Sequence, residues 1–222
     1  MSKSYIFKNS EFNLKIGKII CLARTYKKHA IEMDSIVPVD PILFLKPESS
    51  VIFNNESIVI PKISSCIHHE IELGVVIKKD GKRILQNRAM DYVLGYVVGL
   101  DITARDIQSI AKKNGLPWSI AKGFDTFAPI SDVILKDKID NPLNLNLKLK
   151  INGEIKQESN TKNMIFPIER IIEFVSNIMS LRSGDLILTG TPEGVGEIVK
   201  GDIIEAFLDK YCYLKVDVIM ED

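Results

Sequence analysis

The sequence predicts a mainly β domain of the α+β class. Short segments rich in Ile, Val, Leu or Tyr outnumber the helical segments, and Gly, Asp, Asn and Pro interrupt most of the gaps between them. Strand and helix signals do not alternate regularly, so a doubly wound parallel sheet is not expected. The chain has no low-complexity linker and no repeat of fixed period, so residues 1–222 are expected to form a single domain.

Several segments carry a strand signal. Asn152 and Gly153 lie between LKLKI and EIKQE and are typical of the type I′ turn that closes a β-hairpin. The predicted strands are Ser57–Pro61, Ile71–Lys78, Tyr92–Leu100, Leu145–Ile151, Asp185–Thr189, Ile203–Phe207 and Tyr213–Ile219.

Two longer helices and one short helix are predicted. Thr103 and Asp106 resemble a capping box in which Asp replaces Glu, and Gly115 ends the helix that follows. The apolar face of that helix is expected to consist of Ile107, Ile110 and Ala111.

The second long helix is expected to begin at Pro167, with apolar residues at helical spacing up to Gly184. The short helical candidate covers Thr25–Met33.

The charge balance argues against recruitment of polyanions by the whole molecule. Lys plus Arg and Asp plus Glu both number 29, so the formal net charge is zero, and the basic residues are scattered along the chain. No nucleic-acid or membrane partner is therefore expected. The N-terminus lacks the apolar stretch of a secretory signal, and no run approaches the roughly 18 apolar residues of a membrane span.

The three cysteines, Cys21, Cys66 and Cys212, are widely separated and form no CxxC pair. This pattern disfavours a zinc ribbon or a redox-active pair. Reduced thiols in a cytoplasmic setting are the simplest expectation, although the sequence does not distinguish the cytoplasm from an organelle matrix.

Glu70 and Glu72 lie two residues apart at the mouth of an apolar predicted strand. Because side chains alternate across a strand, both carboxylates are expected on one face, with His68 beside them. Two anions this close need a neutralising partner, and Mg²⁺ or Mn²⁺ prefers carboxylate oxygens. Taken alone, such a pair is more often a solvated strand edge.

Asp101 strengthens the metal hypothesis because it lies at the end of a second apolar strand. The strand would hold its backbone rigidly, while its side chain would be open to a cleft. Asp106 is assigned to the start of the helix, where its charge complements the helix dipole, and Arg105 to an ion pair with an acid. Three carboxylates without a cysteine ligand pattern favour magnesium or manganese, while His68 and His69 keep a zinc alternative open.

Other polar residues suggest acid–base chemistry and anion binding. His29 and Glu32 are three residues apart in a helix-compatible segment, so they can touch and form a general base. Lys122 lies among small and apolar residues, and Thr191 lies in a Gly-containing loop after an apolar strand. Lys122 could bind a carboxylate or an enolate oxygen, and the hydroxyl and exposed amides of the Thr191 loop could hold a substrate carboxylate. Each feature alone also fits a plainer explanation: an exposed histidine, a surface lysine or a simple turn.

Six segments from about Ile20 to the C-terminus follow a recognisable order. They are CLARTYKKHAIEM, PILFLKPESS, HHEIELGVVI, GYVVGLDITARDIQ, NGLPWSIAKGFDTFAPIS and ILTGTPEGVG followed by GD. Together they resemble the fumarylacetoacetate hydrolase family, close to its acylpyruvase and oxaloacetate decarboxylase branch. The resemblance implies a mixed β-roll fold and a homodimer, with residues 1–15 as a short N-terminal extension.

The resemblance also implies roles for residues at matching positions. The family's metal acids match Glu70, Glu72 and Asp101, which implies Mg²⁺, or Mn²⁺, as the cofactor. The other matches are the essential lysine Lys122, the water-activating pair His29 and Glu32, and the substrate-binding residues Arg24, Lys46, Gln108 and Thr191.

The departures from the family pattern are mild. Thr25 stands where Asn is usual, and Leu100 occupies a variable place. The change at Thr25 bears on how residues 25–33 dock, and this segment is expected to act as a lid over the site.

The residues and the resemblance together predict a metal-dependent enzyme that cleaves a C–C bond in small 2-oxo acids. Acylpyruvate hydrolysis, oxaloacetate decarboxylation or both would fit. The alternative is an isomerase or tautomerase of oxaloacetate or a dienoate, which would not need the water-activating pair. A non-catalytic 2-oxo acid binding protein is disfavoured because the metal acids, Lys122 and the His29–Glu32 pair occur together.

Overall fold

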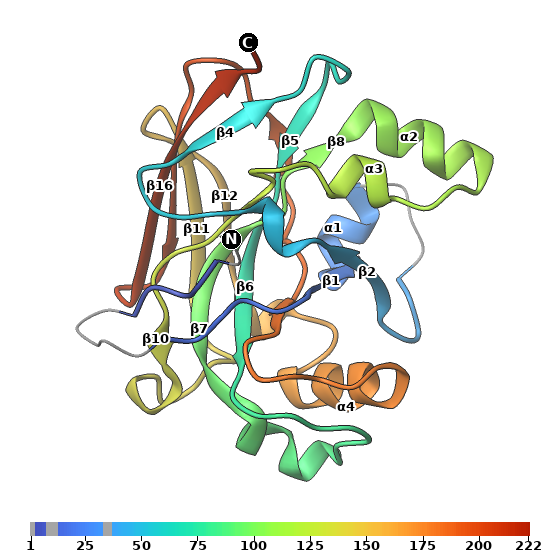
Figure 1. The fold of residues 1–222 in the computed structure, drawn as a ribbon, viewed down its shortest axis with the longest axis vertical. Coiled ribbons are helices and arrows are strands. Elements are labelled where there is room, and N and C mark those ends of the chain that lie inside the picture. Colours follow the sequence, from blue (N-terminus) through green and yellow to red (C-terminus); the bar gives the residue numbers. More distant parts are fainter. Residues whose placement is uncertain (1–2, 8–12, 33–36) are drawn as a thin grey trace.

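Two packed β-sheets form the centre of the computed structural model, which describes residues 3–7, 13–32 and 37–222 (Figure 1). The six-stranded sheet has the order β10 (Ile134–Leu135), β7 (Val93–Leu100), β6 (Ile71–Ile77), β13 (Leu186–Leu188), β1 (Ile19–Ala23) and β2 (Ile42–Lys46). The five-stranded sheet has the order β12 (Glu154–Asn160), β11 (Asn146–Ile151), β15 (Ile203–Leu208), β16 (Cys212–Met220) and β4 (Ser57–Ile60).

Smaller elements surround these sheets. A three-stranded sheet contains β14 (Gly196–Glu197), β5 (Ile67–His69) and β8 (Thr103–Ala104), and β3 (Val51–Ile52) pairs with β9 (Ala128–Pro129). The α-helices are α1 (Lys27–Glu32), α2 (Arg105–Asn114), α3 (Ser119–Lys122) and α4 (Ile168–Ile178). Short 3₁₀ helices cover Glu48–Ser50, Gln86–Tyr92, Lys136–Lys138 and Thr161–Asn163.

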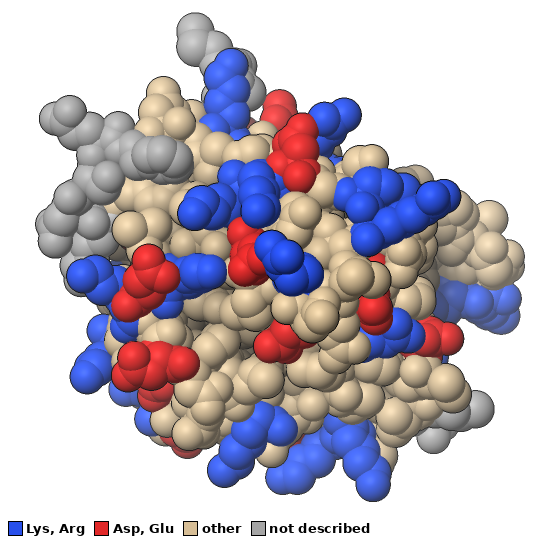
Figure 2. Space-filling model, turned by 90° about the horizontal axis from the view of Figure 1, so that it is seen from below, with Lys and Arg blue, Asp and Glu red and all other residues tan. Residues whose placement is uncertain are grey.

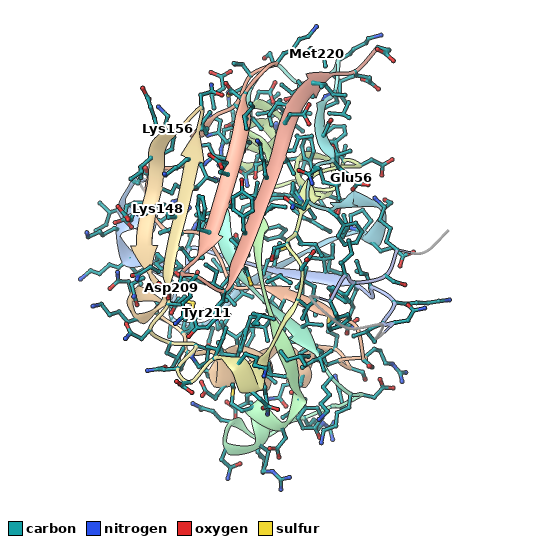
Figure 3. The ribbon with its side chains drawn as sticks, turned by 90° about the vertical axis from the view of Figure 1, so that its left-hand side faces the viewer. Glu56, Lys148, Lys156, Asp209, Tyr211 and Met220 are labelled. Atoms are coloured by element: carbon teal, nitrogen blue, oxygen red, sulfur yellow. The ribbon has the colours of Figure 1, made fainter. Side chains whose placement is uncertain are left out.

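Burial explains the different sequence patterns of the two sheets. Every residue of β6 is buried, because the six-stranded sheet is covered on both faces. Strand β16 alternates between buried and exposed residues, because the five-stranded sheet packs on one face only. Figure 3 shows the other face of that sheet, which carries Lys148 and Lys156.

The mixed, mainly β fold class predicted from the sequence is confirmed. Strands β1 and β13 run parallel while β6 and β7 run antiparallel, so the central sheet is mixed. All seven predicted strands are present, and each end either agrees with the prediction or differs from it by one residue. Asn152 and Gly153 have φ angles of 51° and 86°, as a type I′ turn requires, and they join β11 to β12.

The predicted capping box at the start of α2 is wrong. Thr103 lies in β8, and its hydroxyl donates to Asp101 O at 3.1 Å. Ala104 occupies the N-cap position without a side-chain hydrogen bond. Asp106 instead accepts hydrogen bonds from Ser64 Oγ at 2.7 Å and Ser65 N at 2.8 Å, so its carboxylate holds the preceding loop against the helix.

Two further details of the helices differ from the sequence-based expectation. Ile110 is 60% exposed, because α2 buries Gln108 and Ala111 toward the protein. Helix α4 ends at Ile178 and does not continue to Gly184. Leu181 N donates to Gly81 O at 2.8 Å, so the chain beyond the helix is held by a β-bridge.

The described part of the N-terminal segment packs on the outer face of the six-stranded sheet. Tyr5 and Phe7 are buried in a cluster with Ile16 and Val133, and Tyr5 Oη donates to Gly184 O at 3.0 Å. Within the expected lid, Met33 lies outside the described residues.

Acidic and basic side chains lie among one another over the face shown in Figure 2. Across the described ranges, no helix is long and apolar enough to cross a membrane.

Candidate active site

Three buried carboxylates meet where β6 and β7 adjoin. Glu70 directly precedes β6, Glu72 lies within β6, and Asp101 directly follows β7. The antiparallel register pairs Ile71 with Leu100, and Asp101 N donates to Glu70 O at 2.9 Å. One oxygen of each carboxyl group lies within 4.8 Å of the others. The structure thus brings together the three residues that the sequence suggested as metal ligands.

Two buried oxygens of this cluster have no hydrogen-bond partner in the described part of the chain. They are Glu72 Oε1 and Asp101 Oδ1. Lys46 Nζ lies 2.9 Å from Asp101 Oδ1, but it donates its hydrogen bonds to three backbone carbonyls. Glu72 Oε1 is therefore left without a hydrogen-bond or ion-pair partner among the described residues. This is unfavourable for a buried carboxylate, and hard divalent cations coordinate such oxygens. The residues therefore fit a Mg²⁺ or Mn²⁺ ion held by Glu70, Glu72 and Asp101.

The pKa values show where positive charge is lacking. Burial, with repulsion from Asp101 and Glu70, raises the pKa of Glu72 well above its usual value. Burial acts in the same direction on Glu70, but the Lys122 ammonium and the Arg105 guanidinium outweigh it and hold its pKa below the usual range. A cation placed beside Glu72 would favour its ionised form.

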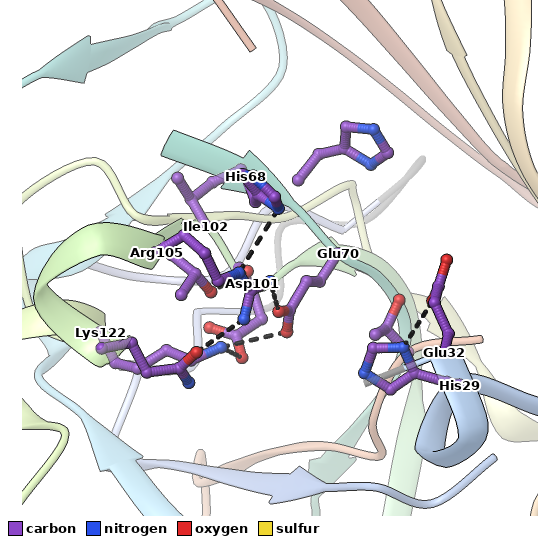
Figure 4. A network of polar contacts seen from close by, with 12 residues as sticks. His29, Glu32, His68, Glu70, Asp101, Ile102, Arg105 and Lys122 are labelled. Atoms are coloured by element: carbon purple, nitrogen blue, oxygen red, sulfur yellow. Dashed lines mark hydrogen bonds and ion pairs between the residues drawn. The ribbon is translucent and has the colours of Figure 1, made fainter. Parts of the chain in front are cut away.

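Two basic side chains contact the carboxylates (Figure 4), and both line the pocket. Lys122, at the end of α3, donates to Glu70 Oε2 at 3.0 Å and to Asp101 Oδ2. Arg105, at the start of α2, donates to Glu70 Oε1 and to Gln108 Oε1, the latter at 2.6 Å. The sequence assigned Arg105 to an ion pair with an acid, and that acid is one of the candidate metal ligands.

Lys46 is almost fully buried, at 2% exposure, and unlike Lys122 it does not line the pocket. Its Nζ donates to Ile102 O at 2.9 Å, Lys122 O at 2.6 Å and Phe127 O at 2.9 Å. With all three hydrogens engaged, Lys46 ties together the backbone around Asp101 and Lys122. This geometry favours a positioning role over the direct substrate contact expected from the sequence.

The predicted acid–base pair lies across the pocket from Lys122, with Glu70 between them (Figure 4). His29 Nδ1 is 3.0 Å from Glu32 Oε2, and the ring is buried. The second carboxylate oxygen of Glu32 accepts a hydrogen bond from Gly194 N at 2.9 Å. Glu32 thus orients His29 and also joins α1 to the loop that follows β13.

One pocket connects most of the predicted site residues. Arg24, His29, Gln108 and Thr191 line it together with Glu70 and Lys122. Glu72, Asp101, Lys46 and Glu32 are not among its lining residues. The remaining lining residues are Leu22, Ala23, Phe44, Arg105, Lys112 and Trp118.

The Thr189-Gly190-Thr191-Pro192 loop reaches the carboxylate cluster through its backbone. Gly190 N donates to Glu72 Oε2 at 2.6 Å. Thr25 Oγ1 donates to Thr189 O at 2.6 Å, so the threonine that departs from the family pattern fixes this loop. Gly190 has a φ of 93°, and a Cβ there would lie 2.0 Å from Thr25 Oγ1.

We expect Gly190→Ala to lower the free energy of unfolding by about 2–5 kcal/mol, because it combines left-handed backbone strain with a steric clash. Gly201→Ala is the matched control, since Gly201 has a φ of 94° and no atom within 4 Å of an added Cβ. It should lose only about 1–2 kcal/mol, the cost of the backbone conformation. Urea denaturation measures both values. Equal losses would show that the contact with Thr25 is unimportant.

Sequence reasoning missed one residue that lines the pocket and one that lies behind its lining. Lys112 was not considered, and it lies one helical turn beyond Gln108 on α2. Gln157 was also missed, because it lies in a polar strand without a motif. It is 1% exposed and donates a hydrogen bond to Thr191 Oγ1 at 2.9 Å. A buried glutamine of this kind has no sequence signal that separates it from its exposed neighbours.

Comparison with known proteins agrees with this geometry. A sequence model of the fumarylacetoacetate (FAA) hydrolase C-terminal family matches residues 18–219. The mitochondrial oxaloacetate decarboxylase of Dictyostelium discoideum is 51% identical over 189 residues, which cover 85% of this chain and 87% of that protein. The mitochondrial oxaloacetate tautomerase of Arabidopsis thaliana is 47% identical over 201 residues, which cover 90% of each protein.

A solved structure shares the same fold over nearly the whole chain. The crystal structure of fumarylpyruvate hydrolase from Pseudomonas aeruginosa, in complex with Mn²⁺ and pyruvate, superposes with a TM-score of 0.95 and 32% sequence identity. The match covers 99% of this chain and 97% of that one. The extent of these matches, together with the buried carboxylate cluster, establishes that the chain belongs to the fumarylacetoacetate (FAA) hydrolase family.

Proposed function

We propose that this protein is a divalent-metal-dependent enzyme that cleaves a C–C bond in small 2-oxo acids. Hydrolysis of acylpyruvates, decarboxylation of oxaloacetate, or both, would use the same pocket. The observation that carries the proposal is the placement of the His29–Glu32 pair on one side of the buried carboxylates, with Lys122 on the other. This arrangement combines a site for a cation with a base and a positive charge beside it.

Magnesium is the proposed cofactor, with manganese as the alternative. The candidate ligands are all carboxylate oxygens, which suit both ions. The pyruvate complex of the Pseudomonas aeruginosa relative contains Mn²⁺, which supports a divalent cation here. The bound ion would supply Lewis-acid polarisation of the 2-oxo acid.

The residues around the pocket divide the remaining tasks. Lys122, Gln108 and Thr191 would hold the substrate carboxylate and the oxygen that gains negative charge. Glu32 accepts the hydrogen bond from His29 Nδ1, so Nε2 is the nitrogen left to take a proton from water. The water oxygen would then bond to the distal carbonyl carbon of an acylpyruvate. Breakage of the adjacent C–C bond yields a carboxylic acid and pyruvate enolate, which takes up a proton.

Oxaloacetate would follow a shorter course in the same pocket. Loss of CO₂ leaves the enolate of pyruvate directly, so no attacking water is required. Lys122 and the polar pocket wall would stabilise the developing charge in both reactions.

Tautomerisation is the second candidate, and the relative named as an oxaloacetate tautomerase favours it. Tautomerisation moves a proton without adding water, so it would not need His29 as a water-activating base. A non-catalytic 2-oxo acid binding protein is the third candidate, and the retained acid–base pair argues against it.

A product screen separates these functions. Acetylpyruvate, oxaloacetate and fumarylpyruvate are each incubated with the protein and Mg²⁺, and pyruvate, CO₂ and enol absorbance are followed independently. Protein-free samples with the same Mg²⁺ correct for decarboxylation in solution. Pyruvate from an acylpyruvate, or pyruvate with CO₂ from oxaloacetate, supports C–C cleavage. A change in enol absorbance without pyruvate supports a tautomerase, and no turnover at all supports a binding protein.

Residues 25–33 are proposed to close over bound substrate. Lys27, Lys28 and Ile31 are exposed, whereas Thr25 and Tyr26 are buried and anchor the start of the segment. A base that must act away from bulk water benefits from such closure.

Hydrogen exchange tests this lid. We expect amide protection across residues 25–33 to rise when oxalate, a mimic of the chelating 2-oxo acid end, is added with Mg²⁺. Mg²⁺ alone serves as the control. Unchanged exchange at saturating oxalate would rule out the lid.

A homodimer and a cytoplasmic location are also proposed. The family resemblance supports the dimer, and sedimentation equilibrium would test it. The three cysteines are free, which suits a reducing compartment.

A further inference from the structure

Gln157 is a buried residue in an otherwise exposed or half-buried strand. It lies in β12, and it is the one fully buried member of that strand, at 1% exposure. The pairing of β11 with β12 shifts beside it: Leu149 faces Gln157, but Lys150 faces Ile155, so Lys156 has no partner. Such β-bulges re-aim side chains and occur next to active sites. Gln157 itself lies opposite the buried Leu149, in the regular part of the pairing, so its side chain points inward.

The hydrogen bonds of Gln157 fix the orientation of its amide. Ile71 N donates to Gln157 Oε1 at 3.0 Å, and His69 Nδ1 lies 2.9 Å from the same oxygen. A backbone N–H can only donate, so Oε1 must be the atom facing Ile71. The amide nitrogen therefore faces the loop after β13, where it donates to Thr191 Oγ1 at 2.9 Å and Pro192 O at 3.0 Å.

This orientation determines what the Thr191 hydroxyl can do. Because Thr191 Oγ1 accepts a hydrogen from Gln157, its own hydrogen is free to point elsewhere. No acceptor for that hydrogen occurs among residues 3–7, 13–32 and 37–222, and Thr191 lines the pocket. The hydroxyl is thus held as a donor toward whatever occupies the pocket.

Gln108, in α2, also presents a hydrogen-bond donor to the pocket. Its Oε1 accepts from Arg105 Nη1 at 2.6 Å, so its NH₂ group is the end left for the pocket that it lines. Arg24 and Lys112 add two more donors to the lining. These donors match an anionic oxygen in a ligand.

We propose that Gln157 is a positioning residue that holds the Thr191 hydroxyl as a hydrogen-bond donor to the carboxylate of a bound 2-oxo acid. The same side chain bonds to the backbone between Glu70 and Glu72, so it links the donor to the strand of the carboxylate cluster. This inference rests on the proposed 2-oxo acid site but assigns a role to a residue outside the pocket lining.

The test is a double-mutant cycle on pyruvate binding, measured by calorimetry in the presence of saturating Mn²⁺. Thr191→Val removes the hydroxyl, and Gln157→Met removes the amide while keeping an unbranched side chain of similar length. Thr191→Ser keeps the hydroxyl, and Glu158→Met changes an exposed residue of the same strand. Mn²⁺ affinity without pyruvate is measured for every variant.

We expect Thr191→Val to weaken pyruvate binding about tenfold or more, as for a lost hydrogen bond to a charged group. Gln157→Met should weaken pyruvate binding by at least about threefold. When Thr191→Val is introduced into the Gln157→Met variant, it should weaken binding by less than about a further threefold. Glu158→Met should bind pyruvate like the wild type, and Thr191→Ser should bind it more tightly than Thr191→Val because it keeps the hydroxyl. Mn²⁺ affinity should stay within about twofold throughout.

Other outcomes overturn the inference in distinguishable ways. Wild-type protein that does not bind pyruvate would refute the proposed function as well. If the wild type binds pyruvate but the two substitutions are additive, or Thr191→Val has no effect, only the role of Gln157 fails. A parallel loss of Mn²⁺ affinity in Gln157→Met would mark Gln157 as a purely structural residue. If Gln157→Met does not fold, Gln157→Asn replaces it in the cycle, because its shorter amide cannot reach both Ile71 and Thr191.

Discussion

Glu72→Ala is expected to lower the affinity for Mg²⁺ or Mn²⁺ by at least about a hundredfold. Loss of a residue that only hydrogen-bonds to a metal ligand already lowers metal affinity by up to about a hundredfold, and loss of a ligand should cost at least as much. Activity on 2-oxo acids should fall below detection. The fold should persist, since the change removes a buried carboxylate whose pKa is raised by burial and by Asp101 and Glu70. Calorimetric metal titration and thermal unfolding measure the two effects.

Glu72→Gln is the matched control, because it keeps an acceptor for Gly190 N while removing the charge. Metal affinity should fall in this variant too, with less disturbance of the loop. Retained metal affinity and activity in both variants would exclude Glu72 as a ligand.

His29→Ala is expected to slow acylpyruvate hydrolysis by about 10² or more, the usual scale for a lost general base. Oxaloacetate decarboxylation needs no attacking water, so it should stay within about tenfold of wild type, or roughly 1.4 kcal/mol of transition-state stabilisation. Initial rates of pyruvate formation from the two substrates give the comparison. Equal losses would show that His29 positions the substrate or closes the lid, and would remove the main support for hydrolysis.

Lys122→Ala provides the contrasting control for His29→Ala. It should slow both reactions, because both pass through the same enolate and because Lys122 contacts Glu70 and Asp101. A loss confined to one substrate would contradict the shared course proposed for them.

Strands could be predicted from the sequence better than helix ends. The buried strand β6 appears as an unbroken apolar run, and Asn152-Gly153 encodes its own turn geometry. The start of α2 could not be predicted, because β5 pairs with β8 and takes Thr103 into a strand. Likewise α4 stops at Ile178, although apolar spacing continues, because Leu181 bonds to Gly81 across the fold. Tertiary contacts thus decided what local sequence left open.

In the candidate site, too, some residues could be predicted from the sequence, while the roles of others depend on tertiary contacts. Strand alternation and the family pattern brought Glu70, Glu72 and Asp101 together from the sequence alone. The role of Lys46 depends on three carbonyls from distant segments, and that of Gln157 on hydrogen bonds to Ile71 and Thr191, so neither follows from local residue patterns.

Metal-dependent release of pyruvate distinguishes an enzyme that cleaves a C–C bond from a tautomerase or a binding protein. Oxaloacetate and acetylpyruvate are assayed separately at increasing Mg²⁺, with wild-type protein, with Glu72→Ala and without protein. We expect wild-type protein to release pyruvate from at least one substrate above the protein-free rate. This release should saturate with Mg²⁺, cease with a chelator and be absent in Glu72→Ala. Metal-dependent C–C cleavage at this site would be refuted if neither substrate released pyruvate. It would also be refuted if neither the chelator nor Glu72→Ala changed pyruvate formation.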